Sequence, residues 1–70
     1  MNSRRFAAHH VVADGCILSP GVVELVNGQV ERYYKLECEL PYTEWMDGTI
    51  EVVDDADGRR VALLNKTKQL

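Results

Sequence analysis

Apolar and polar side chains alternate along most of this chain, as they do in β-strands with one buried face and one wet face. The alternation is clearest over residues 30–40. The dry face of that segment consists of Val30, Tyr34, Leu36, Cys38 and Leu40, with Arg32 as the exception. Segments rich in Val, Ile, Leu and Tyr predict five strands, over residues 4–13, 16–26, 30–40, 49–54 and 59–64.

Glycine placement separates these strands, because four of the five glycines follow Asp or Asn. Such dipeptides accept the positive φ angles of tight hairpin turns. The expected turns are Asp14-Gly15, Asn27-Gly28, Asp47-Gly48 and Asp57-Gly58. Residues 1–70 are therefore expected to form a single all-β domain of five to six mostly antiparallel strands joined by hairpins, as a curled sheet or small sandwich. Residues 41–47 do not alternate and predict a loop or at most one short helical turn near residues 43–46, and residues 66–70 are polar enough to fray.

The Asn27-Gly28 turn also predicts a register, since a two-residue turn places Leu25 opposite Val30 and Val23 opposite Arg32. In the last hairpin, the sequence is compatible with either a two-residue or a four-residue loop around residues 54–58. Either loop leaves the same four apolar side chains on one face, namely Ile50, Val52, Val61 and Leu63.

Continued without interruption, the register of the second hairpin places Leu18 opposite Glu37. A one-residue bulge at Pro20-Gly21 shifts the register so that the apolar faces agree. We therefore predict this bulge. The pairs it implies are Leu18 with Leu36 and Cys16 with Cys38.

Composition narrows the function classes. A formal charge of −3 argues against nucleic-acid binding, which needs a basic face. No stretch approaches the length of a membrane helix, and the polar first residues do not resemble a signal peptide. With only two cysteines, a reducing cytoplasmic location is the expectation, with no membrane partner.

The residues able to do chemistry do not form a recognisable site. His9 and His10 are adjacent in a strand and must face opposite ways, so we interpret them as ordinary strand residues, one of them partly buried. Cys16 and Cys38 lack a C-x-x-C motif and are interpreted as buried, reduced, small apolar residues. The acidic turn at residues 54–58 lacks the spaced carboxylates of a calcium loop. We expect no enzyme activity, no catalytic residues, no metal site and no cofactor.

Aromatic residues are the remaining candidates for contact with a partner. Tyr33 and Tyr34 are adjacent in a strand, so one joins the core while the other, expected to be Tyr33, stands on the charged face. Aromatic side chains anchor protein interfaces. The predicted partner contacts are therefore Tyr33, Tyr34 and Trp45.

The order of elements from Arg5 to about Val53 suggests a family. A strand at residues 6–12 leads through a turn to residues 21–26, an Asn-Gly turn and a strand from Gln29. This order resembles the small β-sandwich domain at the N-terminus of the metal-dependent amidohydrolase superfamily. The family's His-x-His metal motif and catalytic barrel are not in these seventy residues, and His9-His10 lacks the motif's spacing. The resemblance implies an accessory domain with its sheet exposed for association, and it transfers no catalytic residue.

Together these features predict a non-catalytic interaction or self-association module that forms a homodimer. A thin core, strands apolar on both faces and open sheet edges all gain stability from a second copy. The alternatives are an accessory subunit of an amidohydrolase-like enzyme and a small-ligand binder with a pocket beside Trp45.

Overall fold

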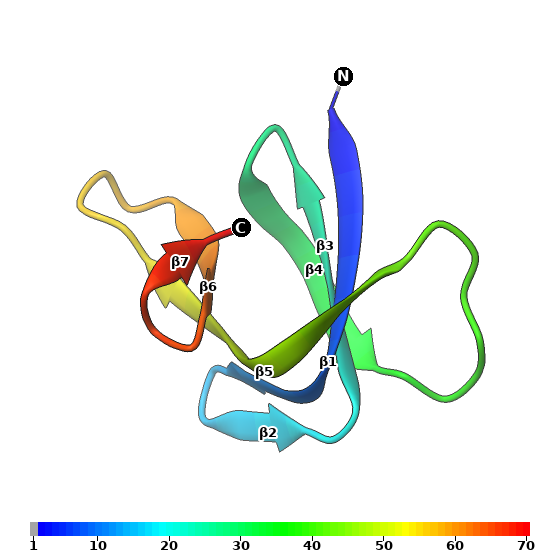
Figure 1. Cartoon of the computed structure of the whole chain (residues 1–70). Helices are drawn as coiled ribbons and strands as arrows, with labels where there is room; N and C mark the ends of the chain where they lie inside the picture. Colours follow the sequence, from blue (N-terminus) through cyan, green and yellow to red (C-terminus); the bar gives the residue numbers. More distant parts are fainter. Residues whose placement is uncertain (1) are drawn as a thin grey trace.

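A computed structural model describes residues 2–70 as an all-β fold with no helix (Figure 1). This confirms the predicted fold class. The strands are β1 (Ser3–Ala13), β2 (Cys16–Leu18), β3 (Gly21–Val26), β4 (Gln29–Lys35), β5 (Glu44–Asp54), β6 (Arg60–Leu64) and β7 (Lys68–Gln69). None of the described residues forms a helix able to cross a membrane.

The strands form one open sheet in the order β4-β3-β1-β5-β6-β7, with β2 also paired to β1. All pairs are antiparallel except β1 with β5, which run parallel. Parallel neighbours need a long connection. Here the connection from β1 to β5 consists of β2, β3, β4 and the wide loop between β4 and β5 in Figure 1, which spans residues 36–43.

The core lies on the inner face of the curled sheet. It comprises Phe6, Ala8, Val11, Ala13, Val23, Leu25, Ile50, Val52 and Ala62. Strands β4 and β6 are not neighbours in the sheet order, yet they contact each other, so the sheet bends back over this core. Leu70 packs against the same core and Lys68–Gln69 pair with β6, in the segment that the sequence suggests will fray.

Three of the four predicted turns are present. Asp14 and Gly15 both have positive φ, as do Asn27 and Gly28. Gly58, also at positive φ, lies in the loop after β5. Asp47-Gly48 is not a turn, and this prediction was wrong. The two residues lie inside β5, which begins at Glu44, where a loop or helical turn was expected.

The proposed bulge at Pro20-Gly21 was wrong, and so were the pairs it implied. Residues 16–26 do not form one strand opposite β4, because the chain divides at Ser19-Pro20 and both pieces pair with β1. Leu18 lies opposite Val11, and Cys16 lies opposite Ala13. Strand β1 has 11 residues, which is long enough for β3 and β2 to pair with it one after the other along the same edge.

A bulge does occur, but in β4, after the second residue pair that follows the Asn27-Gly28 turn. Leu25 lies opposite Val30 as predicted, but Glu24 lies opposite Arg32, so that Glu31 is the extra residue. An extra residue exchanges the two faces of the strand beyond it.

The bulge reverses the expected positions of the two tyrosines. Tyr33 lies opposite Val23 and packs against the core, whereas Tyr34 lies opposite Val22 on the other face. The prediction that Tyr33 stands on the charged face and Tyr34 joins the core was wrong for this reason.

The last hairpin differs from both predicted loop lengths. Asp54 pairs with Arg60, which leaves five residues, Asp55 to Arg59, in the loop. An odd loop length exchanges the faces of the returning strand. Ile50 and Val52 therefore share the inner face with Ala62 and Leu64, and not with Val61 and Leu63.

Gly48 offers a test of the irregularity inside β5. Its φ is +117°, and an added Cβ would lie 2.2 Å from Oδ1 of Asn65. That oxygen accepts a hydrogen bond from the Thr49 backbone N–H, at 3.0 Å. Gly48→Ala should lower the free energy of unfolding by about 2–3 kcal/mol, because it combines backbone strain with loss of this hydrogen bond.

The matched control is Gly28→Ala. Gly28 also has positive φ, at +83°, but nothing lies within 4 Å of an added Cβ. This variant should lose only about 1 kcal/mol, the cost of a left-handed residue with a side chain. Urea denaturation, monitored by circular dichroism, measures the free energy of unfolding of both variants. Equal losses would contradict the role assigned to Asn65.

Candidate interaction surfaces

Side chains on the outer face of the sheet form a row that crosses four strands. Ile17 of β2 pairs with Val12 of β1, Val12 pairs with Glu51 of β5, and Glu51 pairs with Leu63 of β6. Paired residues project to the same side of a sheet. Sequence neighbours such as Val52 belong to the core, so this row faces outward. Ile17 is 66% exposed, which leaves a large apolar side chain in water.

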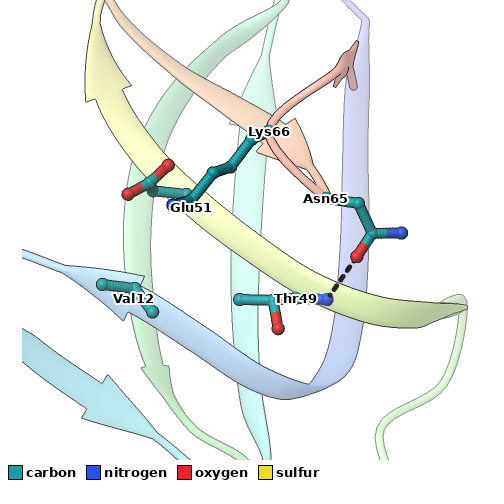
Figure 2. Close-up of a pocket in the computed structure, with 5 residues that line it drawn as sticks. All are labelled: Val12, Thr49, Glu51, Asn65 and Lys66. Carbon is teal, nitrogen blue, oxygen red and sulfur yellow. Dashed lines mark hydrogen bonds between the residues drawn. The ribbon is translucent and has the colours of Figure 1, made fainter.

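A hollow of about 490 Å³ lies on this face. Figure 2 shows the side chains that line it, from β1, β5 and the turn after β6. They are Val12, Thr49, Glu51, Asn65 and Lys66. The Asn65 amide binds the backbone of Thr49, so the turn is attached to β5. Glu51 and Lys66 supply charges of opposite sign beside the apolar Val12.

A second hollow, of about 260 Å³, lies beside Trp45, which is 48% exposed. Trp45 pairs with the fully buried Ala7 of β1, and the residues of the β4–β5 loop complete the hollow. Its lining consists of Ala7, Leu36, Glu39, Leu40, Thr43 and Trp45. The His9 ring contacts the indole in a T-shaped arrangement, with ring centroids 4.9 Å apart.

Two hydrogen bonds attach the loop that forms this hollow to other parts of the chain. The Leu36 N–H donates to the Pro20 carbonyl, at 2.9 Å. Arg5 donates through Nη1 to the Pro41 carbonyl, also at 2.9 Å. The loop therefore reaches β5 along a defined path, although it has no regular secondary structure.

Arg4 and Glu44 join β1 to the first residue of β5. Nε and Nη2 of Arg4 donate to the Glu44 carboxylate at 2.8–3.0 Å, as in a forked ion pair. The Arg4 guanidinium also lies 4.7 Å from the centre of the Phe6 ring. This pair fixes the end of the loop next to Trp45.

Tyr34 belongs to a charged cluster on the outer face. Its hydroxyl donates to the Glu24 carboxylate. Arg5 lies 3.2 Å and Arg32 3.3 Å from the same carboxylate. Partial burial and the hydrogen bond to Glu24 raise the pKa of the Tyr34 hydroxyl.

Tyr33 belongs to a different cluster, which connects strands that are distant in the sheet order. Its hydroxyl donates to Asp14 in the β1–β2 turn, and Arg60 of β6 binds the same carboxylate. The Arg60 guanidinium lies 5.9 Å from the centre of the Tyr33 ring. The Tyr33 hydrogen bond, and after it that of Arg60, lower the pKa of the Asp14 carboxyl. This cluster holds the curled sheet in its bent shape.

The structure thus separates the three predicted partner contacts. Tyr33 and Tyr34 are half-buried, and each donates its hydroxyl hydrogen bond to a carboxylate of the same chain. Trp45 keeps much of its surface in water. The ligand-binding alternative placed a pocket beside Trp45, but the sequence did not indicate its other walls, because Ala7 and Trp45 come together only through the parallel pairing of β1 and β5.

The histidines and cysteines also differ from expectation. His9 and His10 are both exposed, because the register between β1 and β5 shifts between Ala8 and His10. His10 lies 2.8 Å from the Ser19 hydroxyl through Nδ1. Cys16 and Cys38 are free and exposed, so their interpretation as buried apolar residues was wrong. Within residues 2–70, no three His, Cys, Asp or Glu side chains gather as a metal site.

Comparison with protein-family models, with curated proteins and with solved structures finds no match to this chain. The resemblance to the amidohydrolase accessory domain therefore stays a prediction.

The Asp14 cluster predicts how stability depends on pH. Asp14 has a folded-state pKa below its usual 3.8, so its contribution is present above about pH 4 and is lost as the pH falls through the folded pKa. Asp14→Asn should lower the thermal midpoint at pH 6. At pH 3 the difference from the unsubstituted protein should shrink.

Tyr33→Phe should reproduce part of this effect, since it removes the largest cause of the Asp14 shift. Asp57→Asn, at an exposed position of the β5–β6 loop, is the control for the loss of one negative charge. A constant difference between Asp14→Asn and the unsubstituted protein from pH 6 to pH 3 would rule out the linkage.

Proposed function

We propose that this chain is a non-catalytic interaction domain that pairs with a second copy of itself through the outer face of β1, β2, β5 and β6. The observation that carries the proposal is the exposed Ile17 at one end of a cross-strand row with Val12 and Leu63. A large apolar side chain at this exposure gains stability when a partner covers it, by roughly 1.5–3 kcal/mol for full burial.

The charges around the adjacent hollow suit a symmetric pair. In a two-fold dimer each residue that contacts a second residue is contacted by it in return. Glu51 and Lys66 line the same hollow with opposite charges. A two-fold axis placed between Glu51 and Lys66 would bring each Lys66 to Glu51 of the other copy, so that the surface is complementary to itself.

Size gives a reason for pairing. A domain of 70 residues buries only about 60% of the surface its unfolded chain exposes, so its own core contributes little stability. Association adds apolar burial that the single copy lacks. A cytoplasmic location and the absence of enzyme activity are part of this proposal.

The ligand-binding alternative has one observation in its favour, which is the hollow beside Trp45. It uses a different surface from the proposed dimer face, so both functions are compatible in one molecule.

Sedimentation equilibrium at tens of micromolar protein tests the dimer. The expected mass is twice the 7.9 kDa of the single chain. Ile17→Lys should weaken association by at least about tenfold, because it places a charge in the apolar part of the interface.

Gln29→Lys is the matched control, since it adds the same charge at an exposed position of β4. It should leave the dimer intact. Circular dichroism spectra verify that both variants fold. A mass of 7.9 kDa for the unsubstituted protein, or equal dissociation of both variants, would refute the proposal.

A further inference from the structure

We infer that the hollow beside Trp45 receives a lysine or arginine side chain from a basic segment of a partner protein. The inference goes beyond self-association and concerns a separate surface. It rests on the shape of the hollow, its charge and the aromatic ring at its edge.

The shape suits one long side chain. The hollow measures about 260 Å³, which is below the roughly 300–1,000 Å³ of sites that enclose whole small ligands. Most of its lining is apolar, with Ala7 beneath it and Leu36 and Leu40 from the loop. Lysine and arginine have apolar stems that pack along such surfaces while their charged ends stay near water.

The charge of the hollow selects a cation. Glu39 is the one charged side chain among its lining residues, and Glu37 is close to it in the loop. Residues 36–47 carry four carboxylates and neither lysine nor arginine. Glu44 is paired with Arg4. Over residues 2–70 no ion pair involves Glu37 or Glu39, and both are exposed.

Trp45 adds a second attraction for the same group. The face of an indole ring attracts ammonium and guanidinium groups more strongly than other aromatic rings do. His9 contacts the ring, but 48% of the Trp45 surface stays exposed beside the hollow. A metal ion would need several converging oxygen or nitrogen ligands, and the apolar walls do not provide them. An organic cation fits both the walls and the charge.

The surroundings of the hollow are ordered before any ligand arrives. Leu36 is bound to the Pro20 carbonyl, Arg5 holds the Pro41 carbonyl, and Glu44 is held by Arg4. Contacts that need no rearrangement lower the entropic cost of binding. These contacts lie on both sides of Glu39 and Leu40 along the chain, so they limit the paths that this part of the loop can take.

Trp45 is the single tryptophan, so its fluorescence reports on this hollow alone. The probe is a capped five-residue peptide with one central lysine between alanines, titrated at low salt. We expect a saturable change of fluorescence, which weakens when salt screens the exposed charges. The same peptide with norleucine, which keeps the stem and lacks the charge, should bind at least about fivefold more weakly.

Glu39→Gln should weaken binding of the lysine peptide about two- to fivefold, the usual range for an exposed charge pair. Glu31→Gln, an equal loss of charge at an exposed position of β4 outside the hollow, should leave it unchanged. Ile17→Lys should also bind the peptide normally, which separates this site from the dimer face.

Three outcomes would show that the hollow does not select a cationic side chain. The first is no fluorescence change with the lysine peptide, and the second is equal binding of the norleucine peptide. The third is equal binding by Glu39→Gln and the unsubstituted protein. If n-butylamine binds as tightly as the lysine peptide, the hollow is a site for small amines, and the assignment to a protein partner is wrong.

Discussion

The rest of the structure depends on the pairing of β1 with strands along both of its edges. One edge holds β3 and then β2, and the other holds β5 in parallel. Because backbone N–H and C=O groups inside a sheet must be paired, the long β1 takes three strands as direct partners, and β4, β6 and β7 extend the sheet from them. The parallel pairing also forces the long β4–β5 loop to cross from one side of β1 to the other, and this loop forms the hollow beside Trp45.

One extra residue decides which surfaces the molecule presents. The bulge at Glu31 turns Tyr33 toward the core and Tyr34 outward, so each hydroxyl finds a carboxylate in a different part of the sheet. Tyr33 then joins β4 to the β1–β2 turn and, through Arg60, to β6. In a domain with so few buried residues, exposed polar clusters of this kind supplement the apolar core in holding the sheet curled.

The two surfaces proposed for binding differ in chemistry because they lie on different parts of β1 and β5. Near the second half of β1, Val12 and Ile17 leave apolar surface in water between charges of opposite sign, which favours a symmetric partner. Near the first half, Ala7 and Trp45 lie under a loop rich in carboxylates, which favours a basic partner. The register shift between Ala8 and His10 separates the two regions.

Local chemistry by itself determined the all-β class and the hairpins at Asp14-Gly15 and Asn27-Gly28, because alternation and positive φ are properties of neighbouring residues. The sequence also named Trp45 as a candidate partner contact, but its exposure and its place in β5 came from the structure. Only the tertiary structure decided which strand Leu18 pairs with, and which of Tyr33 and Tyr34 faces the core. The parallel β1–β5 pair and the hollow beside it were decided in the same way. The physical reason is that these features depend on a single extra residue at Glu31 or on strand pairings between distant segments. An alternating pattern does not fix either one, because it is equally compatible with either of two adjacent residues facing the core.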